Sequence, residues 1–587
     1  MKHFFSLLRG WPVALLILLW LAGPAARAQA PAWQSALAVQ NASSPSSYSY
    51  VRSIATDASG NVYLVGEFFG NVTFGTTVLT ASTSTTNGLD GFVAKWNAGS
   101  GSFAWAVRLG GSGQDVASAV AVSGSSVYVA GYFSSATAAF GSISLPNATG
   151  SGAVSDGFVT KLTDAGSSAA FAWASPLGGL QADQATAVAV RGSSVYVAGL
   201  FASPSLTVGS TALTNAGTAT NDGFVARFTD AGTSASATWA TGLGGPGTDQ
   251  VSGLALSSTG VLVTGNFSSA AQFGLIALTS AGDVDVFVAK LTEMGTAVAV
   301  AWAVRAGGTS GDVGDAVAAS GTSVFVTGGF ASPTVAFGSA ALTLTPASAT
   351  GNNDVFVAKL TDVGTSAAFV WAQQSVSTGN DRTRAVAVSG ANVYVAGSFG
   401  PATAAFGSTI LTNVSTATAS DIFVAKLVDA GTSGSFAWAR QAGGLSGESA
   451  YALALNGTSV LVAGGASPSA AFGTTVVNAA SSTAGFLASL TDPTLLATST
   501  ARGTLPFILS PNPARATATV QLPAGLGAAT AALTLRDALG RTLRTSTVAL
   551  PAAGLRHALD LSGLAPGVYA VQVRAGSTSG TQRLVVE

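Results

Sequence analysis

Two short phrases alternate along this chain, and each end of the chain holds one phrase without its usual partner. The first phrase, D-G-F-V-A-K or a close variant, places its phenylalanine at Phe92, Phe158, Phe224, Phe287, Phe356, Phe423 and Phe486. The second, as in F-A-W-A-V-R, places its tryptophan at Trp33, Trp105, Trp173, Trp239, Trp302, Trp371 and Trp438. Each Phe phrase is followed by a Trp phrase, except the one at Phe486, and Trp33 has no Phe phrase before it. A closed ring explains this offset, because the Trp33 strand can complete the unit built around Phe486 and cover its exposed edge.

Each unit carries four short strand signals and repeats after about 66 residues, as from Phe92 to Phe158. In the second unit the expected strands are 116–122, 127–131, 157–162 and 171–174. These segments are apolar on both faces, so each sheet needs a neighbour on either side. The pattern predicts an all-β fold, a seven-bladed β-propeller closed by an N-terminal strand. Side-chain size predicts that the A-V-A-V strand is innermost and the tryptophan strand outermost.

The order of the phrases A-x-A-V, V-Y-V-x-G and D-x-F-V-A-K-L resembles the bacterial β-propeller repeat known as SBBP. The resemblance runs from about residue 50 to residue 490. It implies a propeller and no defined activity.

Composition restricts the chemistry that is available. The chain has 587 residues, of which 8% are charged, no cysteine, and histidine only at His3 and His557. Thiol catalysis and thiolate metal sites are therefore excluded, and the repeats offer no histidine as a general base. Residues 31–495 hold 13 Lys+Arg and 22 Asp+Glu, a net charge of -9, which argues against a nucleic-acid-binding surface. We expect no enzymatic activity and no cofactor, with a carbohydrate-active enzyme as the remaining alternative.

An acidic residue follows each of six tryptophans by ten positions. The set is Asp115, Asp183, Asp249, Asp312, Asp381 and Glu448. One interpretation is an acidic mouth that binds a polar ligand or a cation such as Ca²⁺. The favoured interpretation is that each carboxylate accepts backbone N–H bonds at a repeated turn, because a ligand site usually breaks the symmetry of a repeat. No calcium-loop motif is present, and no metal site is predicted.

Three other repeated features have both a structural and a functional interpretation. The tryptophans either pack at the rim or stack against sugars, and packing is favoured because every unit has one. The Lys and Arg of the Phe phrase are either solvated or paired between blades. Length varies mainly in the connection from the second to the third strand, which contains a Phe-Gly phrase, as at Phe74-Gly75. The sequence leaves open whether this phrase adds a fifth strand, which would reverse the chain direction.

The N-terminus is typical of a secretory signal peptide, predicted over 1–28. Lys2 and Arg9 precede a short apolar run, and we place the cleavage between Ala28 and Gln29. The propeller is predicted over 29–490, and no later segment is a candidate for a membrane span.

After residue 490 the repeat phrases stop, and we expect a linker at 491–504 and a small Ig-like β-sandwich at 505–587. This segment resembles the type A C-terminal sorting domain of the type IX secretion system of Bacteroidota. The motif residues are Pro511, Asn512, Pro513, Asp537, Gly540, Arg541, Gly567, Tyr569 and Arg583. The resemblance implies export to the periplasm, recognition by the type IX machinery, and then release or attachment at the outer-membrane surface.

The sequence therefore predicts a secreted or surface-attached propeller that acts as a binding or interaction module. Its partners are the secretion machinery and an unidentified surface glycan or protein, not nucleic acid. The alternatives are a purely structural surface component and a glycan-active enzyme.

Overall fold

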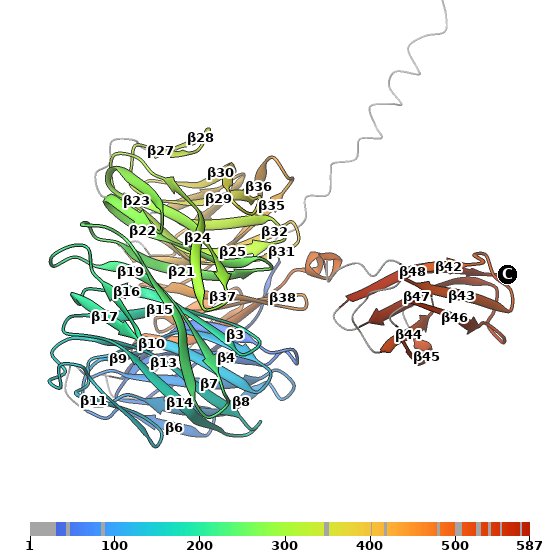
Figure 1. Ribbon diagram of the computed structural model, residues 1–587, viewed down its shortest axis with the longest axis horizontal. Helices are drawn as coiled ribbons and strands as arrows, with labels where there is room; N and C mark the ends of the chain where they lie inside the picture. The colour runs from blue at the N-terminus through green and yellow to red at the C-terminus, as the bar shows by residue number, and fades with distance from the viewer. Residues whose placement is uncertain are drawn as a thin grey trace, which may run out of the picture. The chain divides into compact units, whose positions relative to one another are not determined.

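The computed structural model describes residues 31–42, 47–83, 88–344, 352–400, 402–415, 419–477, 482–498, 507–523, 530–537, 542–551, 554–575 and 578–587. The chain forms two compact units, Met1–Thr498 and Ser499–Glu587 (Figure 1). The described residues form β-strands and one 3-10 helix, η1 (Pro493–Thr498), and no α-helix. The predicted signal peptide and its cleavage site lie outside the described residues.

The first unit contains seven antiparallel sheets with four main strands each, which we number along the chain; the hairpin of the next repeat extends sheet 5 to six strands. Sheet 1 is β3 (Tyr48–Thr56), β4 (Val62–Phe69), β7 (Asp90–Asn97) and β8 (Ser102–Leu109). Sheet 2 is β9 (Asp115–Ser123), β10 (Ser126–Phe133), β13 (Asp156–Asp164) and β14 (Ala169–Leu177). Sheet 3 is β15 (Asp183–Arg191), β16 (Ser194–Phe201), β19 (Asp222–Asp230) and β20 (Ala235–Leu243). Sheet 4 is β21 (Gln250–Ser257), β22 (Gly260–Phe273), β23 (Ile276–Met294) and β24 (Ala297–Ala306).

The remaining sheets repeat the same strand order. Sheet 5 is β25 (Asp312–Ser320), β26 (Ser323–Phe330), β29 (Asp354–Asp362) and β30 (Ala367–Ser377). Sheet 6 is β31 (Asp381–Ser389), β32 (Asn392–Phe399), β35 (Asp421–Asp429) and β36 (Gly434–Ala442). Sheet 7 is β37 (Ser449–Asn456), β38 (Ser459–Ala466), β41 (Ala484–Thr491) and β1 (Trp33–Ala38).

The seven sheets follow one another around a common centre. The first strands of successive sheets lie side by side, and β37 of the last sheet contacts β3 of the first. The A-V-A-V strand is innermost and the tryptophan strand outermost in every sheet, as side-chain size predicts. Hydrophobic clusters fill the spaces between neighbouring sheets; one of them joins Tyr63 of sheet 1 to Val127 of sheet 2. This arrangement explains why the strands are apolar on both faces.

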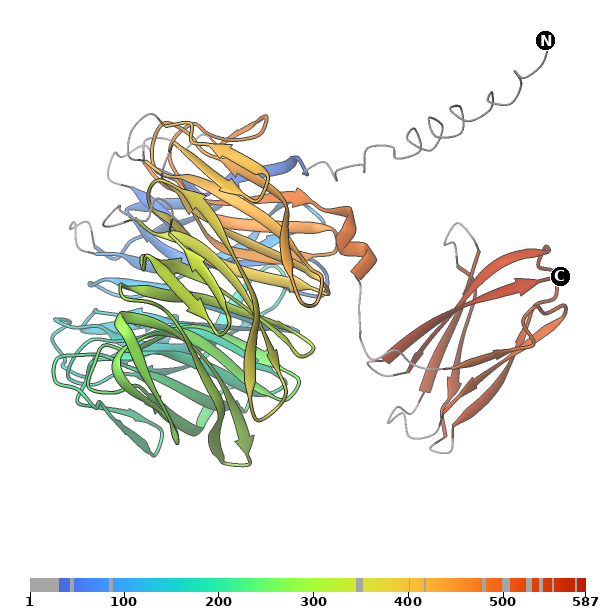
Figure 2. The same cartoon turned by 90° about the horizontal axis from the view of Figure 1, so that it is seen from above.

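The two ends of the repeat region complete each other, as predicted. Strand β1 pairs antiparallel with β41, with Ala38 opposite Phe486 and Trp33 opposite Leu490. Figure 2 shows this blue N-terminal strand beside the orange strands of sheet 7. The edge of β41 is therefore covered by a strand from the other end of the unit.

The Phe-Gly phrase forms a two-stranded hairpin rather than the single fifth strand that the sequence left open, so the chain direction is unchanged. The hairpins of sheets 1, 2 and 3 are β5 (Asn71–Phe74) with β6 (Thr77–Thr80), β11 (Thr137–Phe140) with β12 (Ile143–Pro146), and β17 (Ser205–Val208) with β18 (Thr211–Thr214). Those of sheets 5, 6 and 7 are β27 (Thr334–Phe337) with β28 (Ala340–Thr343), β33 (Thr403–Phe406) with β34 (Thr409–Thr412), and β39 (Ala470–Phe472) with β40 (Thr475–Val477). In sheet 4 the hairpin is continuous with β22 and β23. Gly75 turns the first hairpin with a φ of 61°, a value that favours glycine.

Most hairpins also bridge to the preceding sheet. Strand β33 pairs with β30, and β5 pairs with β2 (Gln40–Asn41), which continues the closing strand. In the hairpin of sheet 2, the backbone N–H of Ala139 donates to the carbonyl of Gly110 in sheet 1 (3.0 Å). The variable connection is thus anchored between sheets at the rim.

The second unit consists of two sheets that share one hydrophobic core. One sheet is β42 (Ile508–Ser510), β43 (Thr517–Leu522) and β46 (Leu555–Asp560). The other is β45 (Thr542–Ala549), β44 (Thr530–Arg536), β47 (Gly567–Ala575) and β48 (Thr578–Val586). Residues 491–498, which were expected in the linker, belong to the first unit, where Leu495 is buried against sheet 7.

Candidate functional site in the central pocket

The six predicted acidic residues lie where the chain enters the innermost strand of sheets 2 to 7, and each is 1% exposed or less. In sheet 2, the Asp115 Oδ2 accepts hydrogen bonds from the Gly111 N–H (2.6 Å) and the Ser135 hydroxyl (2.7 Å). Equivalent serine contacts recur at Asp183 and Asp312. These are the contacts that a turn-capping role requires.

A second buried carboxyl from the preceding sheet stands beside each of these acids. The pairs are Asp90 with Asp115, Asp156 with Asp183, Asp222 with Asp249, Asp285 with Asp312, Asp354 with Asp381, and Asp421 with Glu448. Burial, assisted by the charge of Asp90, raises the pKa of Asp115 to about 6. Gly110 separates this pair, and a Cβ there would lie 2.6 Å from an Asp115 oxygen and 2.7 Å from an Asp90 oxygen. The glycine therefore lets two carboxyl groups approach the backbone between sheets. Among the described residues, no group of three or more His, Cys, Asp or Glu side chains could hold a metal ion.

A third set of carboxylates, six residues after the phenylalanine, connects neighbouring sheets and was missed by the sequence analysis. The example in sheet 3 is Asp230, which accepts hydrogen bonds from Lys161 Nζ (2.6 Å), Tyr128 OH (2.7 Å) and Trp173 Nε1 (2.9 Å) of sheet 2. We call this arrangement the intersheet clamp. The corresponding carboxylates are Asp164, Glu293, Asp362, Asp429 and Asp492, which pair with Lys95, Arg227, Lys290, Lys359 and Lys426.

The clamp decides between the interpretations of two repeated residue types. Lys161 is 6% exposed, and the other four lysines of the Phe phrase are buried as well, so these cations form buried ion pairs between sheets rather than solvated charges. Arg227 is also paired between sheets but is partly exposed. Trp173 is 4% exposed, and the other tryptophans of the repeated Trp phrase in sheets 1 to 6 are equally buried. Their rings are packing elements and are not accessible as sugar-stacking platforms.

The contact between sheets 7 and 1 carries neither charge motif. Ser489 occupies the position of the clamp lysine, and Ala98 the position of the clamp acid. Ala484 and Ser49 replace the two members of the paired carboxyls. Ser49 instead donates to Asn41 Oδ1 (2.9 Å), next to the closing strand. At this contact each motif therefore lacks both of its charged members.

The repeated motifs account for most of the charged residues in the first unit. Eleven of the 13 Lys and Arg in 31–495 bind a carboxylate or a backbone carbonyl. The other two are Arg382 and Arg384, whose guanidinium groups make no hydrogen bond or ion pair among the described residues. Both lie on β31, and both line the same pocket.

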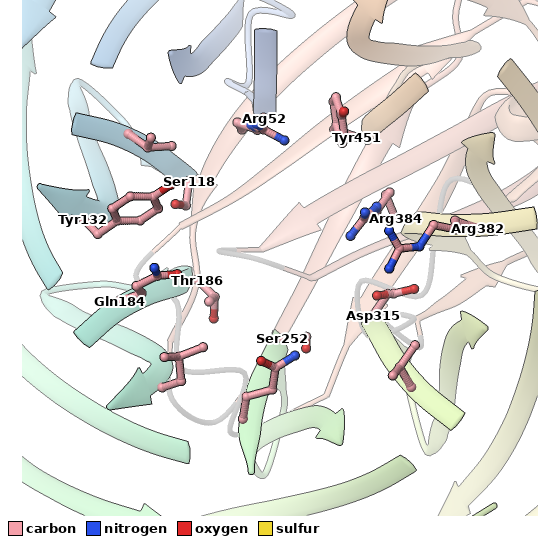
Figure 3. Close-up of a pocket in the computed structure, with 14 residues that line it drawn as sticks. Arg52, Ser118, Tyr132, Gln184, Thr186, Ser252, Asp315, Arg382, Arg384 and Tyr451 are labelled. Atoms are coloured by element: carbon pink, nitrogen blue, oxygen red, sulfur yellow. The ribbon is translucent and has the colours of Figure 1, made fainter. Parts of the chain in front are cut away.

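Arg382 and Arg384 line a central pocket of about 470 Å³ that is bounded by the inner strands of all seven sheets. Each inner strand contributes the residue three positions after the buried acid or its equivalent. The seven residues are Arg52, Ser118, Thr186, Ser252, Asp315, Arg384 and Tyr451. Gln184 and Tyr132 add further polar groups (Figure 3). Gln250 also lines the pocket. The seven sheets repeat, but the chemistry of this ring does not.

The basic side of the pocket is held in place by aromatic and acidic contacts. Arg52 Nε donates to Glu67 Oε2 (2.8 Å), and its guanidinium carbon lies 4.7 Å from the centre of the Tyr451 ring. The Arg384 guanidinium carbon lies 6.0 Å from the same ring. Burial lowers the pKa of Arg384; the charge of Asp315 opposes this shift, whereas the charges of Arg382 and Arg52 add to it. Burial raises the pKa of Asp315 to about 6.

None of the six predicted acids lines the central pocket, although Asp381 lines an adjoining pocket of about 270 Å³. Asp115 at the start of β9 pairs with Phe133 at the end of β10, where the variable connection leaves. The pocket is lined by residues next to these strand ends, so it opens on the side of the variable connections. Sequence reasoning missed the pocket residues because it compared what the repeats share. A comparison of the residue three positions after the buried acid in all seven inner strands would have identified them.

In the second unit, the described motif residues meet at the last strand. Asn512 Nδ2 donates to the Arg583 carbonyl (2.6 Å), and its Oδ1 accepts from the Val585 N–H (2.9 Å). Tyr569 donates to the Ala565 carbonyl (2.7 Å). Gly567 begins β47, which pairs with β48. Pro511 and Pro513 flank Asn512, Asp537 follows β44, and Gly540 and Arg541 lie outside the described residues.

Comparison with known families assigns this unit. Residues 509–587 match the family described as the secretion system C-terminal sorting domain. They form a type IX secretion signal. The chain is accordingly a secreted or surface-attached protein that interacts with the secretion machinery. In the part of the chain that the structure describes, no helix has the length and hydrophobicity to cross a bilayer.

The other comparisons add little. No curated protein matches the chain. A solved structure, dimeric latent PorU from Porphyromonas gingivalis, matches at 11% identity with a TM-score of 0.12. That match covers 56% of this chain and 30% of the PorU chain.

Proposed function

We propose that this protein is an exported binding module in which residues 31–498 form a seven-bladed β-propeller of the SBBP type that holds a ligand in the central pocket. The C-terminal domain delivers it after the N-terminal signal directs it to the periplasm. The observation that carries this proposal is the placement of the non-repeated charges. Arg382, Arg384 and Asp315 lie outside the repeated intersheet motifs, and all three line one pocket at the common centre of the sheets.

A binding role is favoured over catalysis by the available chemistry. Among the described residues, the pocket contains no histidine or cysteine, and its one carboxyl, Asp315, faces arginines rather than a second carboxyl. A pair of carboxyls at a defined separation is what glycoside hydrolysis generally requires. A purely structural role would not need the two guanidinium groups of Arg382 and Arg384 at the centre.

The proposal is tested by screening the mature full-length chain on a glycan array beside Tyr132→Ala and Arg382→Gln. We expect retention of a subset of glycans by the wild type and its loss in both variants. Retention that is unchanged in both variants would place recognition elsewhere and refute the pocket. Export is tested separately in a host with a type IX system, where deletion of 509–587 should leave the protein in the periplasm.

A further inference from the structure

We infer that the central pocket binds a sugar bearing a single anionic group, with the anion against Arg382 and Arg384 and the sugar hydroxyls against the uncharged side. This inference rests on the proposed function and names the ligand class of the same site. It follows from the chemistry of the two sides of the pocket, from the pocket's charge and from its size.

The basic side offers two guanidinium groups that no protein group neutralises within hydrogen-bond distance among the described residues. Arg52 differs from them, because Glu67 holds it in an ion pair. Arg382 is exposed, and Arg384 is only partly exposed and lies near the Tyr451 ring. Guanidinium groups donate paired hydrogen bonds that match carboxylate, sulfate and phosphate oxygens. An anion here would offset both the burial of Arg384 and its repulsion from Arg382.

The charge of the pocket limits how many anionic groups it can take. Arg52 and Glu67 cancel, so Arg382 and Arg384 against Asp315 leave one net positive charge. One anionic group neutralises this pocket, whereas a long polyanion would extend over a unit whose net charge is -9. The ligand therefore places one charged sugar unit, or one charged end of a saccharide chain, in the pocket.

The opposite side of the pocket is polar but uncharged. Ser118, Thr186 and Gln184 lie across from the arginines, with Tyr132 beside them and Ser252 between the two sides (Figure 3). Hydroxyl and amide groups both donate and accept, which suits the hydroxyls of a sugar. A pocket of about 470 Å³ is within the usual size range for small-molecule sites and is much larger than an inorganic anion requires.

The test is isothermal titration of the mature full-length chain with acidic saccharides taken from the array: uronates, sialosides, and sulfated and phosphorylated sugars. Each is compared with its neutral counterpart, and uronates with their methyl esters. We expect an acidic saccharide to bind at least about tenfold more tightly than its neutral counterpart, the factor that one charge-assisted hydrogen bond provides. Arg382→Gln should remove that preference. Because Arg382 is exposed, this variant should fold even if Arg384→Gln does not.

Two further variants separate local charge from general effects. Asp315→Asn should tighten binding by roughly two- to tenfold, because it removes the charge that opposes the anion. Arg191→Gln is the matched control, since Arg191 ends the inner strand β15, lines no part of the pocket and donates to the Ser257 carbonyl. It should leave binding unchanged.

The outcomes distinguish failure of the acidic-sugar assignment from failure of the proposed pocket function. Equal binding of acidic and neutral sugars, with loss in Tyr132→Ala, would overturn the anion assignment and leave the pocket function standing. Binding unaffected by both Tyr132→Ala and Arg382→Gln would overturn both. If inorganic sulfate or a mononucleotide competes as strongly as the best saccharide, the sugar assignment is wrong. Binding of no acidic saccharide on the panel would also overturn it.

Discussion

The intersheet clamp at Asp230 gives a quantitative test of what holds neighbouring sheets together. Replacing Asp230 with Ala removes the acceptor for Lys161, Tyr128 and Trp173 at once. Lys161 is 6% exposed, so its ammonium group loses its counter-ion in a site with little access to water. Removing one partner of a buried ion pair typically costs about 3–5 kcal/mol.

We expect Asp230→Ala to cost about 3 kcal/mol, the low end of that range. The reason is that Lys161 Nζ keeps a second contact, the Gly232 carbonyl at 3.1 Å. Lys161→Met should cost less, about 1–2 kcal/mol, because Asp230 keeps the Tyr128 and Trp173 donors and 8% of its side chain is exposed. The double variant should cost less than the sum of the two single variants, since the Lys–Asp interaction is lost only once.

The assay is guanidinium denaturation of the mature full-length chain followed by tryptophan fluorescence. Every tryptophan after the predicted cleavage site precedes residue 499, so the signal reports on the first unit alone. The matched control is Ser489→Ala, which changes the clamp position of the sheet that has no clamp and should shift stability by less than about 0.5 kcal/mol. If Asp230→Ala costs under about 1 kcal/mol and adds fully to Lys161→Met, the pair behaves as an exposed one and the reasoning is wrong.

Three further predictions concern other parts of the chain. The thermal midpoint of the first unit should fall as the pH rises from about 4 to 7, because the folded-state pKa of Asp249, about 7, lies above the unfolded value near 3.9, so the folded protein binds more protons across that window. Asp222→Asn should flatten this slope in calorimetry; an unchanged slope would contradict the assignment. Asn512→Ala should destabilise the second unit by about 1–2 kcal/mol and speed amide exchange at Val585, which loses its acceptor; unchanged exchange would contradict it. Deleting 29–38 should leave sheet 7 with a bare edge and cause aggregation in size-exclusion chromatography, and a monodisperse product would refute closure by β1.

The architecture was predictable because it depends on what the repeats have in common. The offset between Trp33 and Phe486 predicts the pairing of β1 with β41, and the sizes of the side chains predict the strand order. The hairpins were not predicted, because one Phe-Gly phrase marks a turn equally well in a single strand or in a pair. The acid of the intersheet clamp was also missed, because Asp230 precedes a glycine turn and resembles a local turn residue.

The pocket was unpredictable for a different reason: its residues occupy positions where the repeats differ, within strands that otherwise look alike. Ser118 and Thr186 are ordinary residues for an inner strand, whereas the charged Arg52, Asp315 and Arg384 are unusual in a chain with 8% charged residues. Nothing in a single repeat indicates that these side chains face one another, because their distance depends on closure of the whole ring.

The same geometry explains how such a protein can acquire a ligand without losing its fold. Each intersheet clamp and carboxyl pair must match on two neighbouring sheets, and the contact between sheets 7 and 1 lacks both members of each motif together, at Ser489 with Ala98 and at Ala484 with Ser49. At this contact neither motif therefore leaves one buried charge without its partner. The inner ring carries no such constraint, since Arg384 forms no ion pair or hydrogen bond with a neighbouring sheet among the described residues. A charge placed there affects ligand affinity more than sheet packing, so residues of the inner ring can differ between repeats without loss of the fold.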